Sequence, residues 1–217
     1  MSGLLSPTRK EIEEAVEKHE EEWGCIDKYL YRTCLEWATT IKLCKITEKD
    51  VEYVVKTFLI KWGRLGRVLY RKGKRGWERK ILDSIKSHCR DLSKFRNLRL
   101  EDVELHKYKE KIRALFNNFS KIIGSVGAAK LLHLFAPEFF PLWDTDIRNK
   151  IRKEIKGKEE YKGYKIDASG EGYYYFMLVI QKLLKSKLKI WDMLAKRYKK
   201  PSKLRVIDNY LWVKTRK

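Results

Sequence analysis

Apolar residues recur at helical spacing along most of this chain, and this periodicity limits the fold more than any other feature. Val51, Val54, Val55, Phe58 and Leu59, for example, share one face of a predicted helix. The segments between the predicted helices are short. Strand-like segments do not occur between successive helices, as they would in a parallel α/β sheet. The pattern therefore predicts an all-α fold.

The predicted helices are separated by short polar or glycine-containing breaks. Thr8 and Glu11 have capping-box spacing, which predicts the start of the first helix. Further helices are expected over about 27–43, 47–62, 64–70, 77–85, 103–119, 145–155, 173–184, 188–198 and 201–210. Residues 156–171, rich in Gly, Lys and Tyr, are expected to form an excursion with a small hairpin. The 217 residues fit a single unit, and 43% hydrophobic content is enough for a core.

The charge of the chain points to a polyanionic partner. Lys and Arg number 50 against 29 Asp and Glu, so 50 − 29 gives a formal charge of +21. Neutralising phosphates would relieve this self-repulsion, and nucleic acid is the expected partner. A thermophile surface rich in Lys and Glu would explain many charges of both signs but not the imbalance. No long apolar run predicts a membrane span and no signal peptide is visible, so we expect a cytoplasmic, nucleoid-associated protein.

The four cysteines, Cys25, Cys34, Cys44 and Cys89, lack the spacing of zinc or iron–sulfur ligands. Free and mostly buried thiols are the expectation for a reducing compartment. A disulfide stays open as an alternative if the source is a hyperthermophile.

A small-residue break lies inside the helical pattern at Gly124, Ser125, Val126, Gly127 and Ala128. Such a turn lets backbone N–H groups approach a phosphate, because small residues relax the limits on φ. The helix that follows would point its N-terminus at the anion. A plain helix connector is the alternative for an isolated G-x-x-G turn.

An apolar helix follows this break, and then the residues Phe140 to Ile147, with Trp143-Asp144-Thr145-Asp146 at their centre. Together, break, helix and aspartate resemble the helix-hairpin-helix DNA glycosylase superfamily, which includes the endonuclease III-like enzymes. The resemblance covers about 25 residues. It places Val126 and Gly127 on the second half of the family's hairpin and Asp144 on its catalytic aspartate.

Three departures from the family pattern matter. Ser125 replaces the first hairpin glycine, and Asp146 stands where the family commonly has His. Ala129 occupies the position that is Lys in the bifunctional enzymes, which cleave the strand through a Schiff base. Lys130 is one residue later and would take that role only if the register moves by one. The spacing from Ala129 to Asp144 is also about one helical turn shorter than usual.

The resemblance implies a two-lobed helical bundle of residues 1–217. Its hairpin would lie at 120–135, a cleft would separate the lobes, and the early and last helices would share one lobe. It also implies excision of a damaged or mismatched base from double-stranded DNA by a monomer without metal or organic cofactor. Asp144 would stabilise the oxocarbenium-like sugar or activate water, and Ala129 favours hydrolysis over strand cleavage. The alternative to a catalytic role for Asp144 is a purely structural role as a helix cap.

The remaining candidates are residues that would contact the DNA. The candidates for the pocket that receives the extruded base are Trp143, Trp62 and Tyr173. For each of them, packing in the hydrophobic core is the alternative role. Phosphate contacts are expected from the hairpin and from basic side chains, namely Arg64, Lys72, Lys74, Arg75 and Arg148. Two rival functions stay open, a non-catalytic helix-hairpin-helix DNA-binding protein and an RNA-binding or antiviral helical protein.

Overall fold

The structure is a computed structural model that describes residues 3–71 and 76–216. Within these ranges the regular elements are helices and none is a strand, so the all-α prediction is confirmed. The longer α-helices are α1 (Arg9–Glu22), α2 (Cys25–Thr40), α5 (Trp77–Ser87), α6 (Cys89–Arg96), α7 (Lys109–Phe135), α8 (Thr145–Ile155), α9 (Gly170–Ser186), α10 (Leu188–Arg197) and α11 (Lys203–Thr215). The shorter elements are η1 (Leu43–Lys45), α3 (Glu48–Asp50), η2 (Val51–Val55), η3 (Thr57–Trp62), α4 (Gly66–Leu69), η4 (Leu100–Asp102), η5 (Leu105–Tyr108) and η6 (Glu159–Tyr161).

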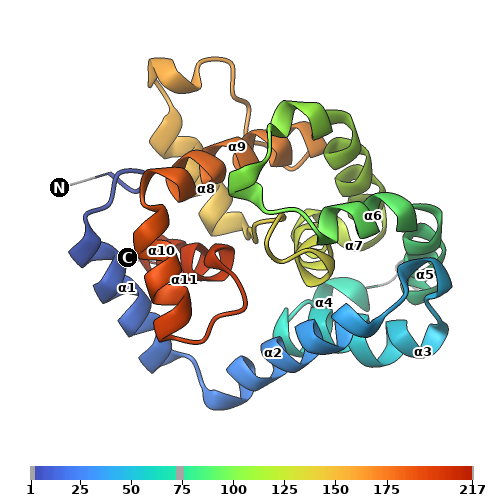
Figure 1. The fold of residues 1–217 in the computed structure, drawn as a ribbon. Coiled ribbons are helices and arrows are strands. Elements are labelled where there is room, and N and C mark those ends of the chain that lie inside the picture. The colour runs from blue at the N-terminus through green and yellow to red at the C-terminus, as the bar shows by residue number, and fades with distance from the viewer. Residues whose placement is uncertain (1–2, 72–75, 217) are drawn as a thin grey trace.

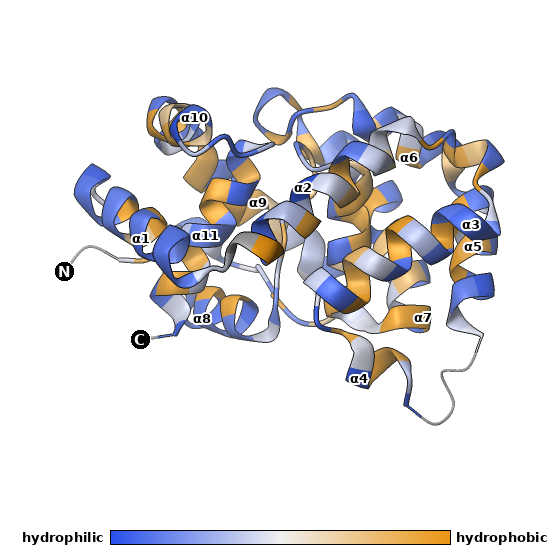
Figure 2. Cartoon of the chain, turned by 90° about the horizontal axis from the view of Figure 1, so that it is seen from below, coloured by the Kyte–Doolittle hydropathy of each residue, from blue (hydrophilic) through white to orange (hydrophobic). Residues whose placement is uncertain are grey.

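The helices α1, α10 and α11 lie at one end of the molecule, and α3, α5 and α6 lie at the other (Figures 1 and 2). α1 and α11, the first and last helices, pack against each other, while α7 packs against α2, α5, α6 and α9. The apolar faces of the helices are turned toward neighbouring helices in Figure 2, as their periodicity predicted. The long helix α7 therefore packs against α5 and α6 at one end of the molecule and against α2 and α9.

A broad aromatic core fills the space between these helices. Its fully buried large side chains include Trp77, Trp143, Trp191, Tyr173 and Tyr210. Among the described residues, no helix is both long and apolar enough to cross a membrane.

The first helix begins at the predicted capping box. The Thr8 hydroxyl accepts the Glu11 N–H at 3.2 Å, and the Glu11 carboxylate accepts the Thr8 N–H at 2.8 Å. These reciprocal bonds satisfy two of the N–H groups that a helix start leaves without an intrahelical partner.

The helix expected over 103–119 begins later, at Lys109, and the expectation was wrong for its first turns. Tertiary hydrogen bonds explain the difference. The Leu100 N–H donates to the Glu138 carbonyl at 3.0 Å, and the Gln181 amide donates to the carbonyls of Leu100 and Val103. The Val103 carbonyl, which the first turn of the expected helix would use, accepts the Gln181 amide instead, and the segment runs as two short 3₁₀ turns before α7.

The excursion after α8 contains no strand in its described residues, which corrects the expected hairpin. Its backbone bonds join residues three apart, such as Tyr161 to Lys158 and Tyr164 to Tyr161. Gly157 and Gly163 adopt φ of 81° and 83°, where glycine is favoured. Consecutive local turns thus replace the cross-strand ladder of a hairpin.

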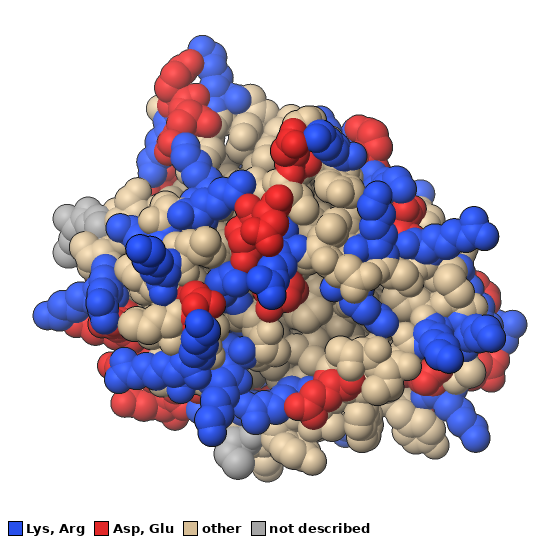
Figure 3. Space-filling model, in the orientation of Figure 1, with Lys and Arg blue, Asp and Glu red and all other residues tan. Residues whose placement is uncertain are grey.

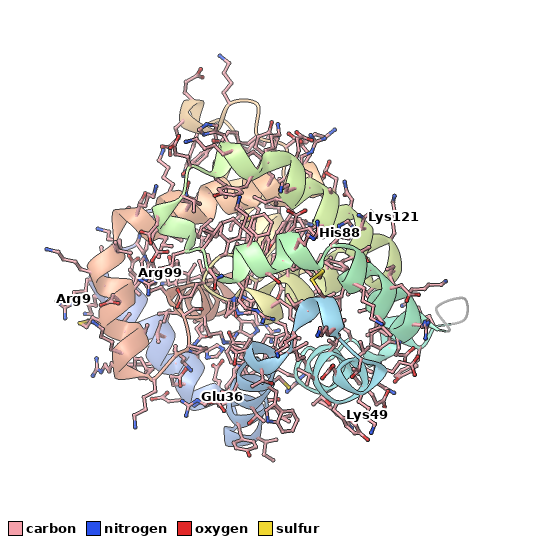
Figure 4. The ribbon with its side chains drawn as sticks, turned by 45° about the vertical axis from the view of Figure 1, so that its right-hand side comes forward. Arg9, Glu36, Lys49, His88, Arg99 and Lys121 are labelled. Carbon is pink, nitrogen blue, oxygen red and sulfur yellow. A yellow bond between two sulfur atoms is a disulfide. The ribbon has the colours of Figure 1, made fainter. Side chains whose placement is uncertain are left out.

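Two of the four cysteines are bonded to each other. Cys44 in η1 forms a disulfide with Cys89 at the start of α6, next to His88 in Figure 4. Cys34 is free and buried. The expectation of free thiols was therefore wrong for Cys44 and Cys89, because the fold brings together two residues separated by 45 positions in the sequence.

Candidate active site

A pocket of about 390 Å³ lies where α1, α2, η3, α7, α11 and the segment before α8 meet. Its aromatic lining is Trp23, Trp62, Trp143 and Trp212. Its charged lining is Glu22, Asp27, Arg64, Lys130, Asp144, Arg205, Asp208 and Arg216. Indole rings and charged side chains of both signs thus surround one space that is large enough for a nucleobase.

Lys130 projects into this pocket from α7. Its ammonium donates a 2.8 Å hydrogen bond to the Gly63 carbonyl and lies 5.2 Å from the centre of the Trp62 ring. Burial lowers the pKa of Lys130 to about 8, and the charges of Asp208 and Asp144 oppose that fall. A lysine in this setting is far more easily deprotonated than one on the surface.

Ala129, the residue that the family resemblance aligned with a catalytic lysine, is fully buried in the core. One helical position turns a side chain by about 100°, so Ala129 and Lys130 face different surroundings. The structure places Lys130, and not Ala129, in the pocket beside Asp144.

Asp144 lines the same pocket at the start of α8. One carboxylate oxygen accepts the Ile147 N–H at 2.8 Å, so Asp144 is the N-cap of the helix. The expected cap is therefore present, and the same carboxylate also faces the pocket. Asp146, two residues later, is exposed and is not part of the lining.

The small-residue break is a kink within α7. Gly124 has φ 80° and ψ 164°, which is not helical, and helical backbone resumes on both sides of it. This conformation is open almost only to glycine. A second helical stretch therefore starts after Gly124, and a helix start is where backbone N–H groups can face a ligand.

The residues around the kink differ in what they offer to a ligand. Gly124, Ser125 and Val126 are partly exposed, whereas Gly127 and Ala128 are buried. A Cβ at Gly127 would lie 3.1 Å from the Ile123 side chain, so this glycine serves helix packing. Gly127 and Ala128 are thus buried within the helix packing, and the contact of their backbone with DNA stays a prediction.

The kink is tied to the segment that carries Asp144. The Trp143 indole N–H donates to the Ser125 carbonyl at 3.2 Å. Trp143 also packs edge-on against Phe116, Tyr173 and Phe176. This packing fixes Asp144 relative to the second half of α7, from which Lys130 projects.

The three candidates for the base pocket separate in the structure. Trp62 and Trp143 line the pocket, although little of either ring is exposed. Tyr173 is fully buried, stacks on Phe116 at 4.5 Å and donates its hydroxyl to the Pro141 carbonyl at 2.8 Å. Tyr173 is not part of the pocket, because core packing uses its whole side chain.

Three residues of α11 complete the pocket and were missed in the sequence. Arg205 donates a hydrogen bond to the buried Asp208 carboxylate, and Trp212 stands one turn further along. The Arg205 guanidinium lies 4.6 Å from the Tyr31 ring centre and 5.2 Å from that of Trp62. An arginine and an aspartate three residues apart, at helical spacing among the apolar positions Leu204, Val206, Ile207 and Leu211, were the sequence signal for this part of the site.

A buried histidine supports the tryptophan walls from behind. His19 stacks on Trp23 with ring centres 5.1 Å apart and meets Trp212 edge-on at 5.3 Å. Burial lowers the pKa of His19 to about 4, so the ring is neutral near pH 7. The wall formed by these two tryptophans is therefore a packed aromatic assembly.

Two of the basic residues expected to contact phosphate, Arg64 and Arg148, lie at or near the pocket. Arg64 lines the rim, pairs with Asp27 at 3.0 Å and has an unusual positive φ of 55°. Arg148 lies 5.5 Å from the centre of the Trp143 ring. Lys72, Lys74 and Arg75 lie outside the described residues. Lys and Arg are distributed over the face seen in Figure 3, with acidic residues among them.

Comparison of this chain with protein-family models, curated proteins and solved structures gives no match.

Proposed function

We propose that this protein is a DNA glycosylase that excises a damaged or mismatched base from double-stranded DNA. The observation that carries the proposal is the meeting of Lys130 and Asp144 in one aromatic-lined pocket. A low-pKa amine and a carboxylate are the two groups that base excision with strand cleavage requires.

The role proposed for Asp144 follows from the chemistry of the N-glycosidic bond. Its cleavage leaves positive charge on the sugar, and a fixed carboxylate stabilises that charge. The hydrogen bond from the Ile147 N–H orients the Asp144 carboxylate, and the Trp143 packing holds the segment in place. Helix capping and catalysis are therefore compatible roles for the same side chain.

Lys130 is the proposed nucleophile. Base excision with strand cleavage through a Schiff base therefore replaces the hydrolysis that Ala129 led us to expect. The neutral amine forms a bond to C1′, and the glycosidic bond breaks with its electron pair leaving on the base, which takes up a proton. The nitrogen then loses a proton as the sugar ring opens, with O4′ taking the ring C–O electron pair and a proton. The resulting protonated imine, an iminium cation, is the Schiff base from which the strand is cleaved or water regenerates the amine.

The altered pKa makes this nucleophile available near neutral pH. With a pKa of about 8, roughly one Lys130 in ten is the free amine at pH 7, against about one in 3,000 at the usual 10.5. This gain of about 300-fold comes mainly from burial in the pocket.

The walls of the pocket suit an extruded base. A nucleotide must leave the duplex for its glycosidic bond to be reached, and flat apolar walls replace the stacking that it loses. Trp62 and Trp23 are held by cations and other rings, with Phe58 stacked on Trp62 at 4.6 Å. These preformed walls support binding of a planar ligand.

The DNA itself is proposed to bind across the kink of α7 and the rim of the pocket. The partly exposed residues Gly124, Ser125 and Val126 form the kink at which a phosphate would meet backbone N–H groups, and Arg64 and Arg148 lie at or near the pocket. The net charge of +21 supplies the sequence-independent attraction.

The direct test is a set of duplexes that each carry one altered base, incubated with the protein and then analysed with and without alkali. We expect one class of duplex to lose its base and to be cut without alkali. Lys130→Gln should remove the alkali-independent cut, and Asp144→Asn should abolish base release. Binding to every duplex without base release from any would favour the non-catalytic DNA-binding alternative, and a preference for structured RNA would favour the RNA-binding one.

A further inference from the structure

The turn that ends η3 has an unusual backbone that base excision as described above does not explain. η2 and η3 are π-helical, a form that is rare in proteins and frequent at functional sites. The Gly63 N–H donates to the Phe58 carbonyl at 2.7 Å. The Leu65 N–H donates to the Leu59 carbonyl at 3.1 Å. Each bond reaches one residue further back than its counterpart at the end of an α-helix, so the turn is wide.

Two residues keep the turn in this shape. A Cβ at Gly63 would lie 2.5 Å from the Leu59 carbonyl oxygen and 3.1 Å from that of Phe58, so a larger residue would move the backbone. Arg64 has φ of 55°, which is strained for a residue with a side chain. Glycine is the usual residue at this position after a helix, so the strain at Arg64 points to a functional constraint.

The Gly63 carbonyl is directed at Lys130 in the pocket. The ammonium donates to this carbonyl at 2.8 Å and lies 5.2 Å from the centre of the Trp62 ring. Within the described part of the chain, no backbone N–H donates to the same carbonyl. The direction of the carbonyl depends on the backbone angles on either side of it, ψ of Gly63 and φ of Arg64. The wide turn therefore aims an acceptor at Lys130.

This hydrogen bond suits each form that the nitrogen takes in the proposed reaction. The neutral amine has two N–H bonds and one lone pair. When one N–H of Lys130 is donated to the Gly63 carbonyl, the lone pair points away from that carbonyl. The iminium on the sugar keeps one N–H, and the same carbonyl is in place to accept it.

We propose that the Gly63 carbonyl is a positioning group that orients the lone pair of Lys130 toward C1′ and holds the nitrogen in the iminium. The inference rests on the proposed function. Condensation of the Lys130 amine with the C1′ aldehyde of an abasic site takes up one proton, releases one water and leaves the cationic iminium. An acceptor that is already in place needs no reorganisation during this step.

Gly63→Ala tests the role, because the added Cβ forces the turn and its carbonyl to move. Cyanoborohydride trapping on an abasic-site duplex, with protein in excess, gives a rate constant and an amplitude. The rate constant at saturating protein should fall by about ten- to a hundredfold, the effect of a small misplacement of a reacting group. The amplitude and the half-saturating concentration should change little. A merely structural role would instead lower the amplitude, which reports the folded fraction.

Gly66→Ala is the matched control. A Cβ at Gly66 would meet the Ile60 side chain at 3.5 Å, which is an ordinary contact, and Gly66 is not part of the pocket lining. Its trapping rate constant should equal that of the parent.

A second pair of variants covers the case that Gly63→Ala does not fold. Arg64→Gly and Arg64→Val both remove the guanidinium and therefore lose the same contacts. Glycine adopts φ near that of Arg64 without strain, whereas a β-branched residue resists it. Arg64→Val should therefore trap about tenfold more slowly than Arg64→Gly at saturating protein.

The hold on the nitrogen can also be measured without DNA. Acetic anhydride is applied in short pulses from pH 6 to 10, and the acetylated fraction of Lys130 is read by mass spectrometry. An acceptor for the ammonium favours the charged form, so Gly63→Ala should lower the midpoint by about one pH unit, and Gly66→Ala should not. The charged side chains that act on Lys130 are the same in both variants, namely Asp208, Asp144, Arg205 and Arg64.

The outcomes separate the two proposals. A lower rate constant and a lower midpoint in Gly63→Ala, with Gly66→Ala like the parent, would support the positioning role. A parental rate constant in Gly63→Ala would overturn it, as would equal rate constants in the two Arg64 variants. Failure of the parent to be trapped at any pH would count against the proposed lysine chemistry. In that case an unmoved midpoint in Gly63→Ala would also overturn the hold on the nitrogen, and a lower midpoint would support it.

Discussion

The kink at Gly124 offers a substitution that separates DNA binding from folding. Gly124→Ala adds a single methyl group at φ 80° and ψ 164°, where a Cβ meets nothing within 4 Å. The cost to folding is therefore backbone strain alone, about 1–3 kcal/mol. For a chain of this length that corresponds to a fall of about 2–12 °C in melting temperature.

The effect on binding should be distinct from this strain. The new methyl group stands on the open side of the kink, where a phosphate would approach the N–H groups of the next turn. Loss of one hydrogen bond to a charged group costs about 1.5 kcal/mol, which corresponds to a roughly tenfold larger dissociation constant. Fluorescence anisotropy with a labelled duplex at fixed salt measures this change.

Gly163→Ala is the matched control. Gly163 has φ 83° and open space for a Cβ, so its substitution imposes strain of the same kind. We expect both variants to melt earlier and only Gly124→Ala to bind DNA more weakly. Equal affinity in Gly124→Ala and the parent, or equal losses in the two variants, would refute the placement of DNA at the kink.

Three further predictions concern the disulfide, the two aspartates and the charge. Replacing Cys44 and Cys89 by Ser should lower the free energy of unfolding by up to about 4 kcal/mol in denaturant titration, because the bond closes a loop of 45 residues; an unchanged midpoint would show that the bond adds no stability. Asp144→Asn should abolish base release while Asp146→Asn, which changes an exposed residue, retains most of it, and losses at both that track equal melting shifts would reduce Asp144 to a cap. Duplex affinity should fall steeply between 50 and 200 mM salt, by about 10³-fold or more for six or more phosphate contacts, and a flat response would exclude phosphate tracking.

The helices were predictable because their signals are local. The Thr8–Glu11 capping box and the apolar faces of residues 47–62 depend on neighbours in the sequence, and both appear in the structure. Where tertiary contacts compete with local preference, prediction was wrong. The Gln181 amide holds the carbonyls of Leu100 and Val103, and the expected helix starts only at Lys109.

The candidate site was predictable only in part, for a similar reason. Asp144 and Lys130 lie within one short segment whose pattern points to a site, although the register of the lysine needed the fold. Arg205 and Asp208 are more than 60 residues further along the chain, and nothing local connects them to Lys130. Tyr173 was misplaced because a buried aromatic and a pocket aromatic look alike in sequence.

The most direct measurement of the central claim is borohydride trapping on a duplex with a single abasic site, because it does not require the altered base to be known. The parent protein should form a covalent complex with the DNA, and mass spectrometry of the digested adduct should locate the sugar on Lys130. Lys130→Gln should form no such complex, while Lys150→Gln, which changes an exposed lysine of α8, should trap like the parent. Trapping that persists in Lys130→Gln, or an adduct on another lysine, would contradict the assignment of Lys130 as the nucleophile.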